Sequence, residues 1–174
     1  MKKTIMMSLA LLSSLIATDY SAVIESPNAS ELIEKDLLAP AKVFTMPKGC
    51  ITTDADAIAR GAFIFHNLNG GKVKGDLPKG IAKKNADGTA KQYGNCVACH
   101  NIEGAKGGGN IGPDLSAYKA MFMATGVRDN QFVYQKIADA RIDNPTTNMT
   151  INLTTKLFNE REICDITSYI VSPK

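Results

Sequence analysis

A cysteine pair followed directly by a histidine is the part of this sequence with the clearest chemistry. The motif reads Cys96-Val97-Ala98-Cys99-His100. Within one helical turn, both sulfurs can face the two vinyl groups of a haem and form thioethers, and the histidine can point at the iron. The spacing therefore predicts one covalently bound haem c, attached through Cys96 and Cys99, with His100 as an iron ligand.

An electron-transferring haem needs a second axial ligand, and this ligand tunes its reduction potential. The candidates in the sequence are Met46, Met121, Met123, Met149 and His66. Met149 is favoured because it lies in a polar loop, where no apolar neighbours explain a methionine. Met121 and Met123 flank a phenylalanine, a setting typical of core filling, and His66 fits a capping or surface position. We expect His100 and Met149 to be the metal ligands.

A proline-containing segment, Asn110-Ile111-Gly112-Pro113-Asp114-Leu115, follows the cysteine motif. The carbonyl of Pro113 can accept a hydrogen bond from the Nδ1–H of His100, which would fix the ring and raise its basicity as a ligand. The segment can also be simply a turn after the glycine-rich stretch 104–109, and both descriptions can hold. We expect Pro113 to support the haem site through His100.

Two further cysteines, Cys50 and Cys164, lie outside the motif. Zinc is the rival ligand for a cysteine pair. A zinc site would need two more ligands from Cys50, Cys164 and His66, and none of these forms a second close pair. In an oxidising compartment, an even remainder of cysteines favours a disulfide. The alternatives are two buried thiols, or a functional sulfur near the iron.

Helical periodicity identifies the elements that must position these residues. Helices are predicted over 54–66, 130–141 and 159–172, with a short amphipathic one over 30–38. Thr53 with Asp56 is similar to a capping box at the first long helix, and Gly61 would allow another helix to approach closely. A polar loop, 143–155, carries Met149, and no strand pattern of any length appears. The sequence therefore predicts an all-α domain.

Residues 67–92 form a lysine-rich insertion, with six lysines against two aspartates and a net charge of +4. A charge run of this kind is most often a solvated surface loop. The sharper interpretation is a docking patch for an acidic partner, because complementary charge raises the rate of encounter.

The chain has 174 residues, of which 44% are hydrophobic and 6% aromatic, and a net charge of +3. This balance predicts one domain and gives no indication of a nucleic-acid partner. Residues 1–17 have the basic start and apolar run of a secretory signal peptide, with cleavage after Ala17 or as late as Ala22.

The apolar run falls short of the ~20 residues of a membrane span. We therefore expect export to the periplasm without stable membrane insertion, and an uncleaved anchor is the alternative. An N-terminal arm, 18–52, would then precede the main domain, 53–174.

The chain resembles the SoxX family of class I cytochromes c over roughly residues 54–172. The resemblance rests on Gly94-Asn95-Cys96-Val97-Ala98-Cys99-His100, on 111–115, on Asp143-Asn144-Pro145-Thr146-Thr147-Asn148-Met149, and on 160–170 with Asp165 and Tyr169. The haem motif is general among cytochromes c. The Asn-Pro-x-Thr-x-Met loop and its distance from the last helix are what point to SoxX.

The resemblance implies a class I cytochrome c fold, in which the N- and C-terminal helices pack together around one covalent haem. It also implies an electron-transfer subunit of a SoxAX complex, an L-cysteine S-thiosulfotransferase. A SoxA-type partner would carry the catalytic haem and couple thiosulfate to a cysteine of the SoxYZ carrier. This chain, with no catalytic residue of its own, would pass the electrons to a small cytochrome c. The alternatives are a free-standing electron shuttle and a haem-based gas sensor.

Overall fold

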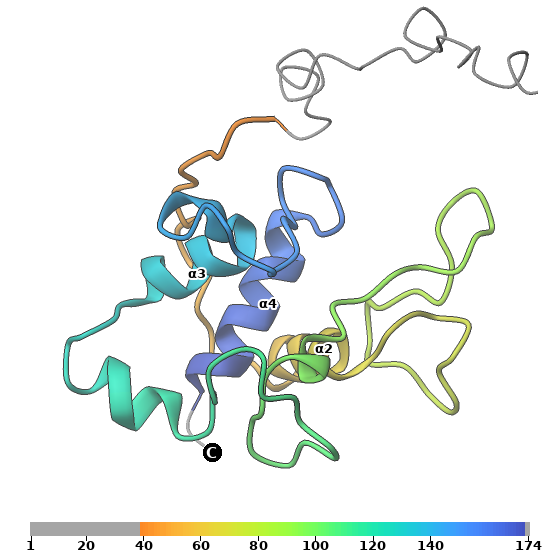
Figure 1. Cartoon of the computed structure of the whole chain (residues 1–174). Coiled ribbons are helices and arrows are strands. Elements are labelled where there is room, and N and C mark those ends of the chain that lie inside the picture. Colours follow the sequence, from red (N-terminus) through yellow and green to blue (C-terminus); the bar gives the residue numbers. More distant parts are fainter. Residues whose placement is uncertain (1–38, 173–174) are drawn as a thin grey trace, which may run out of the picture. The chain divides into compact units, whose positions relative to one another are not determined.

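The described part of the chain, residues 39–172 of a computed structural model, is an all-α domain (Figure 1). Its α-helices are α2 (Ala55–His66), α3 (Asn130–Ala138) and α4 (Glu160–Val171). Shorter helical turns lie at Cys96–Ala98, Lys119–Met123 and Ala140–Ile142. Extended pairing within residues 39–172 is limited to two isolated β-bridges. The predicted fold class is therefore confirmed.

Three predictions concern residues that the structure does not describe. The signal peptide, the first part of the arm and the short helix at 30–38 lie outside residues 39–172. Among the helices of the described region, none has the length and apolar character that a membrane crossing requires.

The helices α2 and α4 pack directly against each other. Gly61 makes this contact possible, because a Cβ atom at this position would lie 2.0 Å from the carbonyl oxygen of Asp165. One residue earlier, Arg60 forms an ion pair with Asp165, with 2.7 Å between Nε and Oδ2. The predicted role of Gly61 is confirmed, and the first and last of these three α-helices pack together as a cytochrome c fold requires.

A disulfide joins Cys50, near the end of the arm, to Cys164 in α4. Of the uses considered for these two cysteines, the structure therefore shows the bridge. Close by, the Thr52 N–H donates a hydrogen bond to Ser168 Oγ at 3.2 Å, and Ser168 donates one to the Cys50 carbonyl at 3.2 Å. The arm is thus fixed to the last helix just before α2 begins.

The described part of the arm also lies along α3, where two glutamines bind its backbone. Gln131 accepts a hydrogen bond from the Met46 N–H at 2.8 Å and donates one to the Phe44 carbonyl at 2.8 Å. Gln135 accepts from the Phe44 N–H at 2.7 Å and donates to the Lys42 carbonyl at 3.1 Å. Because residues four apart lie on one face of a helix, the two amides contact successive stretches of the arm. This part of the arm therefore lies against the domain.

The start of α2 differs from its prediction. The predicted cap was Thr53 with Asp56, but the N-cap is Asp54, whose carboxylate accepts a hydrogen bond from the Ala57 N–H at 2.9 Å. Aspartate is at least as good an N-cap as threonine. Thr53 and Asp54 are adjacent, so the pattern of apolar residues cannot show which of the two is the N-cap.

The end of α3 also differs, because the helix stops at Ala138 and not at Arg141. Asp139 is fully buried, and its carboxylate accepts a hydrogen bond from the backbone N–H of Arg141 at 3.1 Å. It thereby caps a separate turn, Ala140–Ile142. A side chain that binds nearby backbone in this way competes with continuation of a helix.

Candidate functional site

The cysteine–histidine motif forms a short turn beside the C-terminal end of α2. Cys96 to Ala98 are a 3-10 helix, and the N–H groups of Cys99 and His100 both donate to the Cys96 carbonyl, at 3.0 and 2.9 Å. Neither Cys96 nor Cys99 is in a disulfide. The turn thus holds two available sulfurs and a buried imidazole close together, as thioether attachment of a haem requires.

The imidazole of His100 is fixed by the proline segment. Its Nδ1 lies 2.8 Å from the Pro113 carbonyl oxygen, and since a carbonyl only accepts, Nδ1 is the donor. With Nδ1 as the donor, Nε2 is the ring nitrogen that can bind iron. The hydrogen bond proposed from the sequence is present, whereas the contribution of Pro113 to haem binding stays a prediction.

Three glycines that the sequence analysis did not single out surround the motif. A Cβ atom on Gly112 would lie 2.3 Å from Cε1 of His100, and one on Gly94 would lie 2.6 Å from Sγ of Cys96. On Gly109 it would lie 2.1 Å from the Ala98 carbonyl oxygen. The position of these glycines next to the motif was the one sign in the sequence of their role. Whether a neighbouring group comes too close for a side chain depends on the folded structure.

The surroundings of the motif cysteines favour thioethers over a zinc site. Burial raises the pKa of the Cys96 thiol to about 12, which disfavours the thiolate that binds zinc. The disulfide removes Cys50 and Cys164 as ligands. No cluster of three or more His, Cys, Asp or Glu side chains occurs in the region described. A thioether sulfur carries no charge, so it is compatible with the same burial.

Met149 is half-buried in the polar loop before α4, and the loop is tied to α3. Its own N–H donates to Thr147 Oγ1 at 3.1 Å. Further along, Asn152 Nδ2 donates to the Ile137 carbonyl at 2.7 Å, and the Leu153 N–H donates to the Ala138 carbonyl at 3.0 Å. The loop is therefore ordered against the helix, which suits a residue that must hold a ligand position. The ligand role of Met149 stays a prediction.

The other candidate ligands have different surroundings. Met46 and Met123 pack against the core, which was expected of Met123. Met121 is 59% exposed, so the prediction that it fills the core is wrong. His66 Nε2 lies 2.9 Å from the Tyr169 hydroxyl. A nitrogen that shares a hydrogen bond in this way is a poor candidate for coordination, and Met149 remains the favoured second ligand.

Two buried polar atoms of the described region have no hydrogen-bond partner among the protein's own atoms. These are the hydroxyl oxygen of Tyr134, on α3, and Oδ1 of Asn152, in the loop that carries Met149. Buried polar atoms normally find a partner, which can be a bound group. Together with the paired sulfurs and the oriented imidazole, these unpartnered atoms are compatible with a bound group such as a covalent haem.

The comparisons with known proteins support this assignment. The family model for cytochrome c matches residues 85–174, which is about half of the chain and includes the cysteine motif, Pro113 and Met149. A search of curated proteins gives no match.

Proposed function

This chain belongs to the cytochrome c family, and on that premise we propose that it is the electron-transfer subunit of a periplasmic haem complex of the SoxAX type. As a family member it carries one covalent haem c, and its role is electron transfer through the haem iron. What goes beyond the family is the partner, the sulfur chemistry and the periplasmic location.

The residues of the site have separate tasks toward the haem. When bound, the haem supplies an iron that accepts and releases one electron at a time. Cys96 and Cys99 would hold the porphyrin, and Nε2 of His100 and the sulfur of Met149 would bind the iron. Pro113 keeps the His100 ring in one orientation through the 2.8 Å hydrogen bond. The described residues thus need only bind, orient and exclude water.

The reaction assigned to the complex is an oxidation that this chain does not itself catalyse. A sulfur of thiosulfate joins the sulfur of a carrier cysteine, the thiol loses its proton, and two electrons leave. The bond would form at the haem of a SoxA-type partner, on the SoxYZ carrier. The present chain would take the electrons singly and pass them to a small cytochrome c.

The observation that carries the proposal is the loop 143–149, with its Asn-Pro-x-Thr-x-Met pattern. The longer polar loop that contains it, 143–155, is bound to the end of α3, where Thr154 Oγ1 donates to the buried Asp139 at 3.2 Å. The arrangement supports a ligand loop held by the domain.

Affinity purification at native level, with haem staining and mass identification of bound proteins, tests the proposal. A tightly bound second cytochrome with a cysteine iron ligand is the expected result. A lone monohaem protein would contradict the complex.

A free-standing electron shuttle is the second candidate, and a specific feature favours it. Five lysines of the insertion 67–92 are exposed and form no salt bridge with any residue of 39–172, namely Lys72, Lys74, Lys79, Lys83 and Lys84. Transient encounter with redox proteins benefits from such charge. The purification experiment separates the two candidates, because a shuttle would be recovered alone.

A further inference from the structure

The lysine-rich insertion begins and ends beside the haem-attachment turn. Figure 1 shows residues 67–92 as loops that extend away from the helices on the side of α2. At their base, Asn69 and Gln92 form an antiparallel bridge, and the Tyr93 N–H donates to the Leu68 carbonyl at 2.9 Å. Asn95, next to the first motif cysteine, donates its N–H to the Asn67 carbonyl at 3.0 Å. The base of the insertion is therefore bonded to the residues that precede this turn.

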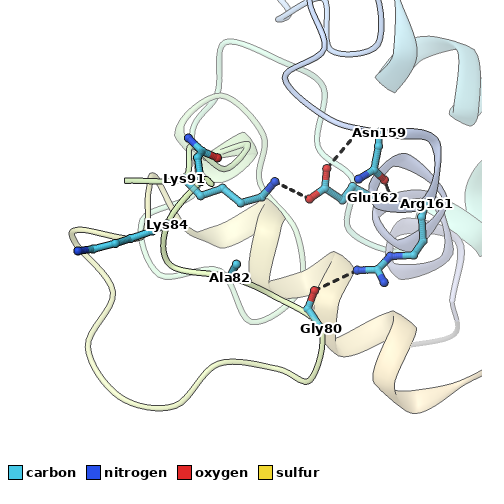
Figure 2. Close-up of a pocket in the computed structure, with 8 residues that line it drawn as sticks. Gly80, Ala82, Lys84, Lys91, Asn159, Arg161 and Glu162 are labelled. Atoms are coloured by element: carbon cyan, nitrogen blue, oxygen red, sulfur yellow. Dashed lines mark hydrogen bonds and ion pairs between the residues drawn. The ribbon is translucent and has the colours of Figure 1, made fainter. Parts of the chain in front are cut away.

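The insertion is largely exposed, as expected of a solvated loop, but it is also bonded to the helical core. Lys91 pairs with Glu162 of α4, with 2.8 Å between Nζ and Oε1, and Arg161 donates to the Gly80 carbonyl at 3.0 Å (Figure 2). The Tyr93 hydroxyl donates to the Ala82 carbonyl at 2.6 Å. Lys91, one of the six lysines, thus has a structural role, and it helps to hold the others on a fixed support.

The remaining five lysines are presented to solvent. Lys84, for example, is exposed and points away from α4 and from the Lys91–Glu162 pair (Figure 2). The insertion carries a net charge of +4, whereas the whole chain carries +3. The rest of the chain therefore has no net positive charge. The positive charge of the insertion distinguishes it from the remainder of the protein.

The composition of this surface favours a protein partner over a lipid surface. The exposed large apolar side chains of the described region are Val43, Leu68, Ile111, Met121, Val127 and Ile142, and only Leu68, at the base of the insertion, lies within 67–92. Beyond that base the insertion offers charge without an exposed large apolar group to enter a bilayer. Unpaired charge on a fixed backbone suits a brief electrostatic encounter.

We propose that the insertion 67–92 is the docking surface for the acidic face of a redox partner protein. Its unpaired lysines attract that face, and the base of the insertion holds it beside the haem-attachment turn. The inference rests on the electron-transfer role of the family and not on the thiosulfate reaction, so either can fail without the other.

Stopped-flow electron transfer from the reduced holoprotein tests the docking surface. The probe is an acidic blue-copper protein, compared with a form of it whose acidic patch is neutralised. Two variants of this chain have the same net charge: Lys74→Gln/Lys83→Gln/Lys84→Gln within the insertion, and Lys48→Gln/Lys119→Gln/Lys156→Gln outside it. All six residues are exposed. Lys91 is left intact, because it holds the insertion in place.

Electrostatic steering changes association rates by about 10-fold or more. We expect the insertion variant to lose about that factor at low ionic strength, with the control within about twofold of wild type. The difference should vanish at high salt and with the neutralised probe. Equal losses in both variants, or no loss in either, would overturn the proposal. The proposal would also be overturned if the insertion variant kept the wild-type electron-transfer rate but, unlike wild type, no longer sedimented with vesicles of anionic lipid.

Discussion

The single residue that decides the type of haem site is the second axial ligand. Met149 is half-buried in a loop that hydrogen-bonds to α3, whereas the competing methionines are packed in the core or exposed. A thioether on the iron raises its potential and closes it to small ligands. Met149 therefore bears on the choice between an electron carrier and a gas-binding protein.

We expect Met149→Ala to abolish the weak sulfur-to-iron absorption band near the red end of the oxidised spectrum. Loss of the ligand should also allow the reduced protein to bind carbon monoxide rapidly. Met121→Ala is the matched control, because that side chain is 59% exposed, and it should leave the band unchanged. A band that survives in Met149→Ala would mean that another residue is the ligand, and rapid carbon monoxide binding by the unaltered protein would favour a sensor.

Gly112 is the second decisive residue, because its lack of a side chain leaves room for the His100 ring. Gly112→Ala would place a methyl group 2.3 Å from Cε1 of His100, so the ring or the proline segment must move. Overpacking of this kind costs about 1–3 kcal/mol. We expect that loss in urea unfolding, together with a changed haem spectrum.

Gly71→Ala is the control for this substitution. Its nearest neighbours would be Asn69 Oδ1 at 3.3 Å and the Ala90 Cβ at 3.7 Å, both on side chains. A change within about 0.5 kcal/mol and an unaltered spectrum are expected, as for an ordinary surface substitution. Equal effects of the two substitutions would show that Gly112 has no special relation to the histidine.

At the scale of elements, Asp139 connects three segments that are far apart in the chain. Its carboxylate binds the Arg141 guanidinium, with 2.8 Å between Nη2 and Oδ2. It also accepts from Thr154 of the ligand loop at 3.2 Å and from the Lys42 N–H of the arm at 3.4 Å. Arg141 in turn donates to the Ala39 carbonyl at 2.9 Å. The arm and the Met149 loop thus meet at the end of α3.

We expect Asp139→Asn to destabilise the protein by about 3 kcal/mol at pH 7, because it leaves the Arg141 charge largely buried without its partner. Hydrogen bonds from Arg141 are the main reason that the pKa of Asp139 is lowered from its ordinary 3.8. A lowered carboxyl pKa stabilises the fold above the ordinary value, and this stabilisation is lost as pH falls through the folded pKa.

Urea unfolding at pH 7 and in steps down to pH 3 measures this effect. The difference between wild type and Asp139→Asn should narrow below about pH 4. Asp143→Asn is the control, since Asp143 pairs with Lys136 at a partly exposed site and should change stability by less than about 1 kcal/mol. A difference that does not vary with pH would argue against the Asp139–Arg141 pair as its source.

At the scale of the whole molecule, the disulfide constrains most of the unfolded chain, because Cys50 and Cys164 are 114 residues apart. Closing so long a loop stabilises a fold by about 5 kcal/mol in the chain-entropy description. We expect a loss of that size in urea unfolding of Cys50→Ser/Cys164→Ser. Added reductant should not destabilise this variant further.

Thiol counting on the denatured, unreduced holoprotein checks the same bridge directly. No free thiol is expected, because Cys96 and Cys99 would be thioethers and the other two cysteines are paired. Two free thiols would contradict the disulfide in solution.

Features set by neighbours in the chain were predictable. The spacing of Cys96, Cys99 and His100 alone indicated a covalent haem, because the attachment chemistry fits within one helical turn. The apolar periodicity likewise located α2 and α4 to within one or two residues. The position of Gly61 on α2 was sufficient to predict a close helix contact, which the structure contains.

Features that depend on partners distant in the chain were not predictable in this way. Asp139 caps the turn after α3 through a local bond from the Arg141 N–H, but its bonds to the arm and to the Met149 loop depend on the fold. Lys91 could not be separated from the other lysines of the insertion until α4 brought Glu162 within 2.8 Å.

The sequence by itself determined the cofactor and the helical class, since both depend on residue types at short spacing. The tertiary structure decided that Cys50 and Cys164 are joined, that Asp139 binds the arm and which lysine of the insertion pairs with α4. Each of these depends on the folded distance between groups that are remote in the chain.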